Sequence, residues 1–255
     1  MDATLSPPRP AVRFEPGDDG IGVVAMADAS GRNEMSRGFV EELLGALRLA
    51  ARWPDLRVVL LVGLPEVFSA GASLDVLRAL ARGGLAPTDI VLSKAILDVP
   101  VPVIASMEGH AIGGGLALGL SADMVLIARE SRYGASFMNM GFTPGMGMIR
   151  LLEHALSPAM AHELLYSGEA RRGSSFEGRS GFNAILPRAD VRPHAEALAR
   201  RIAEKPRRAL ELLKRTLTIP RRRGFEETHT LESLMHEVSF AEPDVLSRIE
   251  AHHDE

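Results

Sequence analysis

Short, uniformly apolar segments alternate with segments of helical periodicity along the first two-thirds of the chain. Residues 57–63, 102–106 and 124–128 are rich in aliphatic residues at successive positions, as in strands that helices cover on both faces. Residues 12–14 and 21–27 are also strand-like, and the Gly- and Asp-rich turn between them predicts a hairpin. This alternation of strands and helices predicts an α/β fold with an open, mostly parallel sheet.

Helical periodicity dominates the last third of the chain. An earlier amphipathic helix is predicted from Met35 to Trp53, beginning after Asn33. Later helices are predicted at 157–166, 189–203, 206–218, 225–238 and 243–252. The expected organisation is a disordered leader at 1–10, an α/β core at 11–190 and a C-terminal helical subdomain at 191–255. We expect this subdomain to pack back on the sheet, because no long Gly/Ser linker precedes it.

Composition narrows the class of protein. Hydrophobic residues make up 46% of the 255 residues and charged residues 24%, which is ordinary for a globular protein and unlike a disordered chain. The net charge of -4 provides no basic field for nucleic acid. No apolar run approaches the about 20 residues that a membrane helix needs. Cysteine is absent, which excludes disulfides and thiolate chemistry and leads us to expect a cytoplasmic location.

The histidines give no sign of a metal site. None of the eight forms a pair with the spacing of a zinc motif. His252 and His253 lie near the end of the sequence, where we expect frayed surface.

Two glycine-rich segments are the best candidates for a functional site. Residues 68–75 and 109–116 each place small residues after a buried strand and before a predicted helix. Backbone N–H groups at such turns face outward without obstruction, so each segment can donate a hydrogen bond to a developing oxyanion. Tight packing is the alternative explanation for either segment alone. A dinucleotide site and a phosphate loop are disfavoured, because the required glycine spacing and a Gly-Lys-Ser/Thr sequence are absent.

Taken together, the segments resemble those of the crotonase (enoyl-CoA hydratase/isomerase) superfamily, and the resemblance extends from about Val12 to Ile249. The motifs that carry it are Phe68-Ser69-Ala70-Gly71-Ala72, Gly109-His110-Ala111-Ile112-Gly113-Gly114-Gly115, Ser121-Ala122-Asp123-Met124 and Thr143-Pro144-Gly145-Met146-Gly147. The resemblance implies an α/β crotonase fold, a spiral of repeated ββα units with a C-terminal helical trimerisation region, as a homotrimer or dimer of trimers. It also implies an oxyanion hole formed by the backbone N–H groups of Ala72 and Gly114. Phe68, Gly71 and Gly113 are then expected beside the acyl thioester.

The chain departs from the hydratases of this superfamily at two positions. Family hydratases carry two glutamates that activate water, and the resemblance places them at Ala117 and Phe137. Neither side chain can exchange a proton, so we expect no hydratase activity. An oxyanion hole without these acids suits a reaction that generates its own enolate.

Among crotonases, the chain is most similar to the decarboxylases of polyketide β-branching. The similarity lies in residues 141–147, in His236-Glu237-Val238-Ser239-Phe240 and in the following Glu242-Pro243. It implies decarboxylation of a 3-methylglutaconyl thioester on an acyl carrier protein, with His236 as the proton donor to the dienolate. The acyl chain is then carried on phosphopantetheine or coenzyme A, and no metal or redox cofactor is implied.

A second departure concerns the substrate carboxylate. The resemblance places a lysine and an aromatic hydroxyl of the decarboxylases at Leu80 and Val76, so their usual carboxylate anchor is missing. Arg78 or Arg82 on the same predicted helix could replace it by bidentate pairing. The apolar pocket for the acyl chain is expected from Phe137, Met138, Met140, Phe142 and Met146.

Two other functions stay open at this stage. One is a double-bond isomerase acting on the same kind of thioester, with His236 as its proton shuttle. The other is a non-catalytic scaffold that binds a carrier protein through residues 200–223, which hold ten basic and two acidic residues for a local charge of +8. A solvated helix face is the plainer explanation of that basic stretch.

Overall fold

The computed structural model describes residues 10–85 and 92–253, so residues 1–9 of the expected leader lie outside the described residues. A six-stranded sheet forms the centre of the fold, in the order β1-β2-β4-β7-β9-β12. Its strands are β1 (Val12–Pro16), β2 (Ile21–Met26), β4 (Val58–Val62), β7 (Val103–Met107), β9 (Met124–Ala128) and β12 (Ala184–Leu186). Only β1 is antiparallel to its neighbour. The predicted hairpin and the mostly parallel sheet are confirmed.

Shorter strands form a second layer beside this sheet. A four-stranded sheet has the order β11-β10-β8-β5, and β3 pairs with β6. These strands are β3 (Glu34–Met35), β5 (Val67–Ser69), β6 (Gly71–Ala72), β8 (His110–Ile112), β10 (Arg132–Gly134) and β11 (Ala170–Arg172). Strands of two or three residues leave no detectable periodicity, and our sequence analysis did not predict them. Each long strand followed by a short strand and a helix makes one ββα unit, as the crotonase resemblance implies.

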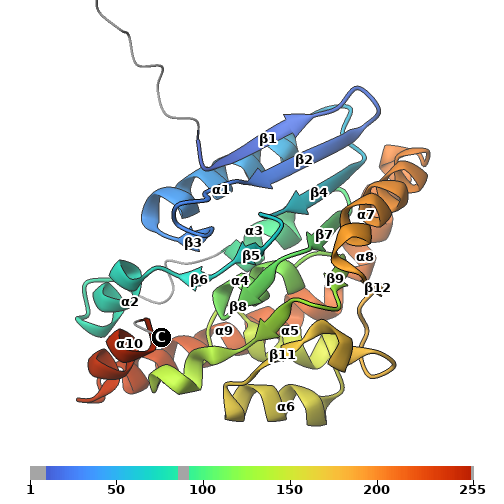
Figure 1. The fold of residues 1–255 in the computed structure, drawn as a ribbon. Coiled ribbons are helices and arrows are strands. Elements are labelled where there is room, and N and C mark those ends of the chain that lie inside the picture. The colour runs from blue at the N-terminus through green and yellow to red at the C-terminus, as the bar shows by residue number, and fades with distance from the viewer. Residues whose placement is uncertain (1–9, 86–91, 254–255) are drawn as a thin grey trace, which may run out of the picture.

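Helices cover both faces of the central sheet (Figure 1). The helices up to residue 167 are α1 (Arg37–Arg52), α2 (Leu74–Ala81), α3 (Leu92–Asp98), α4 (Gly114–Leu120), α5 (Met148–Ala155) and α6 (Pro158–Ser167), with 3-10 turns η2 (Ser136–Met140) and η3 (Gly173–Phe176). Alternate residues of β4 face opposite sides: Val59 and Leu61 pack with α1, whereas Val58, Leu60 and Val62 pack with α7 (Arg188–Ala203). This two-sided burial explains the uniformly apolar strands.

The first helix begins later than the sequence indicated. Ser36 is its N-cap and accepts a hydrogen bond from the Phe39 N–H. Residues 34–35 instead pair with residues 71–72 as strands. The prediction of a start after Asn33 was therefore wrong, because a tertiary strand pairing overrides the local helical periodicity.

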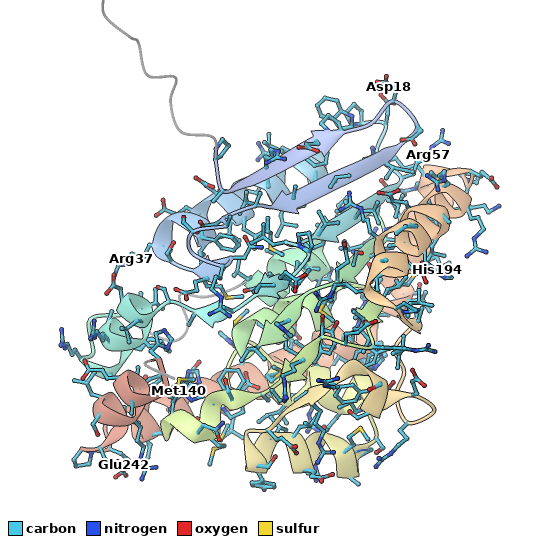
Figure 2. The ribbon with its side chains drawn as sticks, viewed as in Figure 1. Asp18, Arg37, Arg57, Met140, His194 and Glu242 are labelled. Carbon is cyan, nitrogen blue, oxygen red and sulfur yellow. The ribbon has the colours of Figure 1, made fainter. Side chains whose placement is uncertain are left out.

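The C-terminal helices are packed onto the core. They comprise α7, α8 (Arg207–Leu217), α9 (Ile219–Phe240) and α10 (Val245–His253). The boundary proposed at residue 190 falls inside α7, whose alanines are buried on the central sheet. Arg57, just before β4, donates to the Ala203 carbonyl at 2.6 Å and fastens the end of α7 to the sheet (Figure 2). Helix α9 begins six residues before its predicted start at Phe225 and includes Gly224.

Part of the basic stretch at 200–223 is internal. Lys214 is 5% exposed, and its ammonium lies 2.9 Å from the Asp123 carboxylate and 2.9 Å from the Val101 carbonyl. Burial lowers the pKa of Lys214. Arg221 contacts Asp123 as well, at 2.5 Å, and Arg222 pairs with Asp98. These three cations hold α8 and α9 against the core, so only part of the basic stretch is available as a docking face. Its exposed members are Arg200, Arg201, Lys205, Arg208, Arg215 and Arg223.

The described residues contain neither a candidate membrane helix nor a candidate metal cluster. No helix among residues 10–85 and 92–253 combines the length and apolarity that crossing a bilayer requires. The same residues contain no group of three or more histidine, cysteine or acidic side chains placed to hold a metal ion.

Candidate active site

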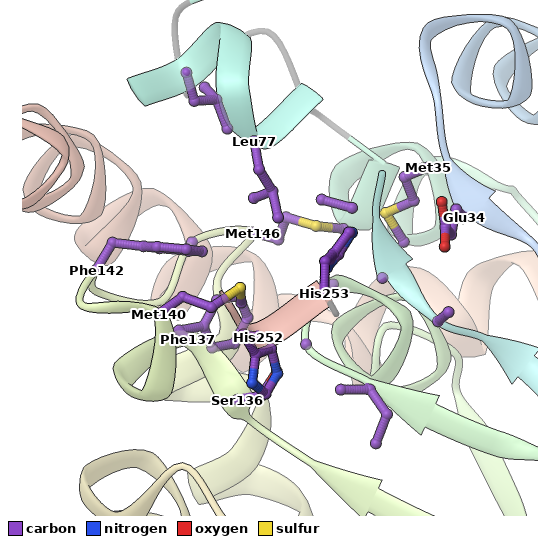
Figure 3. A pocket seen from close by; sticks show the side chains of 18 of the residues that line it. Glu34, Met35, Leu77, Ser136, Phe137, Met140, Phe142, Met146, His252 and His253 are labelled. Atoms are coloured by element: carbon purple, nitrogen blue, oxygen red, sulfur yellow. The ribbon is translucent and has the colours of Figure 1, made fainter. Parts of the chain in front are cut away.

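A cavity of about 300 Å³ lies where the two glycine-rich segments meet. Its lining comes from β3, β6, α2, the start of α4, η2, the 142–146 loop, α9 and the end of α10. Figure 3 shows that Phe137, Met140, Phe142 and Met146 form much of one wall, while Glu34 and Met35 lie on the opposite side.

The two glycine-rich segments approach each other closely. A Cβ atom added at Gly71 would lie 2.9 Å from the Ile112 carbonyl oxygen and 3.6 Å from the Gly114 nitrogen, so only glycine fits there. Gly71 and Gly113 also have φ values of +96° and +52°, which L side chains rarely adopt. Ala72 and Gly114 both line the cavity. Because Gly114 is the first residue of α4, its N–H has no partner within that helix.

Asn33 fastens the first segment in place. Its side-chain amide donates to the carbonyls of Met26 and Phe68, at 3.2 and 3.0 Å, and accepts from the Asp28 N–H at 2.9 Å. Its own carbonyl accepts from the Ser69 hydroxyl at 2.8 Å. Asn33 is fully buried with a φ of +53°, a conformation that asparagine tolerates better than most residues. Sequence reasoning missed this role, because its partners are distant backbone groups.

The aromatic wall agrees only in part with the sequence expectation. Phe137 and Phe142 line the cavity and pack edge to face with ring centroids 6.0 Å apart. Phe142 also stacks on Phe240 of α9 at 4.5 Å. Met138, by contrast, is 41% exposed and points away. Phe68 belongs to the hydrophobic core and does not line the cavity, so its side chain is not placed to touch substrate.

His236 faces inward from α9 and lines the cavity. It is 8% exposed, and its Nε2 lies 2.6 Å from the Thr143 carbonyl oxygen. Because a carbonyl oxygen can only accept, Nε2 carries a proton, and Nδ1 is unprotonated in the neutral ring. Burial lowers the pKa of His236. The apolar residues Leu231, Leu234 and Val238 of α9 are more than half exposed.

Glu232, one turn before His236, holds the same loop. Its Oε2 accepts a hydrogen bond of 2.7 Å from the Gly147 N–H, whereas its Oε1 is buried without a hydrogen-bond partner. Burial raises the pKa of Glu232 to about 7. Ser239 adds a third contact, since its hydroxyl accepts from the Thr143 N–H at 3.3 Å. Polar residues of α9 thus set the position of the 143–147 loop.

The two arginines proposed as carboxylate anchors do not reach the cavity. Arg78 forms an ion pair with Glu250 of α10 at 2.9 Å, and Arg82 is the C-cap of α2. Neither lines the cavity, whereas Leu80 does. The anchor interpretation was wrong, because Arg78 is paired with Glu250 and neither arginine lines the cavity.

Other lining residues escaped the sequence analysis. His252 and His253 both line the cavity at the end of α10; the expectation of surface holds for the exposed His253 and was wrong for the partly buried His252. Packing of α10 against α2 and η2 brings them there. His110 and Arg32 line it as well; burial lowers the pKa of His110, whose Nδ1 accepts from the Arg132 N–H at 2.8 Å. At the expected hydratase positions, Ala117 is buried within the core and Phe137 lines the wall.

We predict that Glu232 makes stability depend on pH. The pKa of Glu232 is about 7 in the folded protein, whereas the ordinary value for glutamate is 4.5. Between these pH values the folded protein therefore binds more protons than the unfolded chain. Stability should therefore fall as pH rises from about 4.5 to about 7, by on the order of 3 kcal/mol. Glu232→Gln should flatten this slope in urea unfolding measured at several pH values. The exposed Glu237→Gln on the same helix is the control, and equal slopes in parent and Glu232→Gln would contradict the assignment.

Comparison with known proteins agrees with this geometry. Residues 17–252 match the enoyl-CoA hydratase/isomerase family. The chain is 38% identical over 226 residues to the bacillaene synthase decarboxylase PksI of Bacillus subtilis, covering 89% of this chain and 91% of that protein. It is 27% identical over 218 residues to a probable enoyl-CoA hydratase of Mycobacterium leprae, covering 85% and 83%.

Solved structures show the same relationship. The ECH2 decarboxylase domain of CurF from Lyngbya majuscula superposes with a TM-score of 0.89 and 36% identity, covering 95% of this chain and 99% of that one. An enzyme from a dehydratase/decarboxylase couple involved in polyketide β-branching gives 0.92 and 36%, covering 96% and 100%. The chain therefore belongs to the enoyl-CoA hydratase/isomerase, or crotonase, family.

Proposed function

We propose that this protein decarboxylates a 3-methylglutaconyl thioester carried on an acyl carrier protein during polyketide β-branching. The observation that carries the proposal is a cavity in which Ala72 and Gly114 meet, while Ala117 and Phe137 occupy the positions expected for water-activating glutamates. Hydration lacks its acid and base there. The similarity to PksI and to the CurF decarboxylase domain supports loss of carbon dioxide as the alternative reaction.

The chemistry matches what two backbone donors can do. When the bond to the carboxylate breaks, its electron pair moves through the conjugated double bond onto the thioester oxygen, and neutral carbon dioxide leaves. The N–H groups of Ala72 and Gly114 stabilise the resulting dienolate oxygen. The apolar wall of Phe137, Phe142 and Met146 favours conversion of a localised carboxylate into a delocalised anion. No metal or redox cofactor is needed, because the substrate supplies the electrons.

His236 is the proposed proton donor to the dienolate. Its Nε2 proton is committed to the Thr143 carbonyl, so donation to carbon takes place from Nδ1 of the imidazolium form. A lowered pKa makes that imidazolium a stronger acid. The position of the ring then decides which carbon receives the proton.

One observation favours a second candidate function, isomerisation of a double bond in the same kind of thioester. Glu34 and His236 both line the cavity and can exchange protons with an acyl chain. Isomerisation needs such proton exchange and no carboxylate on the substrate.

The exposed apolar residues of the C-terminal helices support the homotrimer that the family resemblance implies. Those on α8 and α9 are Leu212, Leu213, Leu217, Ile219, Leu231, Leu234 and Val238, each more than 40% exposed. Burial of such a surface stabilises an oligomer. We predict a mass in light scattering of about three times 27.5 kDa, or six times for a dimer of trimers. A monomer at micromolar concentration would contradict this proposal.

Gly114→Pro tests the reaction and the oxyanion hole together. Proline is tolerated at the first position of a helix but removes the N–H, so release of carbon dioxide from 3-methylglutaconyl thioester should fall about 10²–10³-fold. Gly114→Ala keeps the N–H, and the nearest atoms to its Cβ belong to the flexible side chains of Met146 and Met35, whose sulfurs at 3.1 and 3.2 Å need to shift by a few tenths of an ångström. It should retain most activity. Alkene migration without carbon dioxide would establish the isomerase, and carrier binding without turnover would establish a scaffold.

His236→Gln should slow protonation of the dienolate or change the ratio of alkene isomers. In the parent protein the step should slow as pH rises, with a midpoint below the ordinary imidazole value of 6.5, because burial disfavours the imidazolium. Deuterium incorporation and product ratio measured between pH 5 and 8 test both statements. His154→Gln, outside the cavity on α5, is the control. An unchanged rate, product ratio and pH profile in His236→Gln would remove this residue from the mechanism.

A further inference from the structure

The cavity leaves the substrate's carboxylate without a partner on α2. Leu77 and Leu80 are the residues of α2 that line it, and the helix's nearby cation, Arg78, is paired with Glu250. A carboxylate placed against such a wall loses its hydration, which costs several kcal/mol unless hydrogen-bond donors replace the water. A dicarboxylic acyl chain therefore requires donors from another element.

Most polar side chains in the cavity are already committed or unsuited. Nε2 of His236 donates to Thr143, and Nδ1 of His110 accepts from the Arg132 N–H, which leaves His110 its Nε2 N–H on the β8 strand. Glu34 repels a second carboxylate. Arg32 precedes β3 and lines the cavity as well. Arg32, Glu34 and His110 thus come from the β3 and β8 segments, and none of them lies on α2 or α10.

The remaining candidates are the adjacent imidazoles of His252 and His253. Both line the cavity, and among residues 10–85 and 92–253 neither ring forms a hydrogen bond or ion pair. His252 is half-buried and His253 is exposed at the cavity's edge. Figure 3 shows both in the space bounded by Ser136, Phe137 and Met146.

The fold holds this histidine pair firmly against α2. Val245 and Ile249 of α10 are buried in the core, and Glu250 pairs with Arg78 of α2. The two histidines occupy the last turn of α10, where the helix dipole favours a positively charged side chain. Arg78 is thus a positioning residue: it keeps the end of α10 beside the α2 wall.

We propose that His252 and His253 bind the carboxylate of the acyl substrate. The proposal rests on the proposed function, because it concerns the group that leaves as carbon dioxide. Contacts to the carboxylate exist before the bond breaks and weaken as neutral carbon dioxide forms. They therefore contribute mainly to substrate binding, and their loss should raise KM more than it lowers kcat.

The test compares two saturated pantetheine thioesters that differ in one carboxylate. A 3-methylglutaryl thioester keeps the carboxylate but lacks the double bond that accepts the electron pair, so it does not decarboxylate. An isovaleryl thioester lacks the carboxylate. The double variant His252→Ala/His253→Ala should bind the glutaryl ligand about 10- to 100-fold more weakly, the range for hydrogen bonds to a charged group. Its affinity for the isovaleryl ligand should be unchanged.

Three further variants separate anchoring from general damage. His252→Gln/His253→Gln keeps N–H donors and should recover part of the glutaryl affinity. Arg78→Ala should lose part of that affinity by freeing α10, without affecting the isovaleryl ligand. His162→Ala, an exposed histidine on α6, should affect neither. Equal losses for both ligands, or no loss for either, in the double alanine variant would overturn the proposal.

The outcome is separable from the fate of the proposed function. The double alanine variant could lose affinity only for the glutaryl ligand while the parent releases no carbon dioxide from 3-methylglutaconyl thioester. That result would support the histidine anchor and contradict decarboxylation. If the parent releases carbon dioxide and KM is unchanged in the double alanine variant, the result supports decarboxylation and contradicts carboxylate binding by His252 and His253.

Discussion

The close approach of two backbone segments is the constraint on which this site depends. Gly71 lies so near Ile112 and Gly114 that a single added carbon atom would force them apart. The β5–β8 pairing brings the segments together, and the amide of Asn33 holds the first of them from the opposite side. Main-chain packing thus sets the positions of the Ala72 and Gly114 N–H groups, and these positions do not depend on side-chain rotamers. Such preorganisation is what stabilisation of an oxyanion requires.

Helix α9 has one face at the cavity and exposed apolar residues on the other. Its inner face carries Glu232, His236 and Ser239, which hold the 143–147 loop by three hydrogen bonds. That loop carries Met146, which lies over Gly114. The outer face exposes Leu231, Leu234 and Val238 beside Glu226, Glu227 and Glu237. A helix with polar residues inward and apolar residues outward suits a protein that buries its outer face on partner subunits and uses its inner face to shape a site.

The residues at the expected catalytic positions restrict which reactions the cavity can support. Ala117 and Phe137 stand at the positions where the resemblance places the water-activating carboxylates of a hydratase, while the two glycine-rich segments still meet at the cavity. In the proposed reaction, negative charge collects on the thioester oxygen, and proton transfer is limited to the titratable groups that line the cavity. The leucines of α2 cannot bind the substrate's carboxylate, because they have no hydrogen-bond donor in their side chains. In the proposal, histidines of α10 at the C-terminal end of the described chain bind it instead.

Long strands, the hairpin, the two glycine-rich segments and the family could all be predicted from the sequence, because apolar runs and glycine spacing are local properties. The short strands of the second layer could not, since two or three paired residues carry no period. Leu231, Leu234 and Val238 recur at helical spacing on α9, and such spacing does not tell an apolar face that packs on a core from one that is exposed, as these are. The placement of Arg78 outside the cavity and of His252 and His253 inside it was decided by α10 docking on α2. That contact joins residues far apart in the chain, and no local pattern records it.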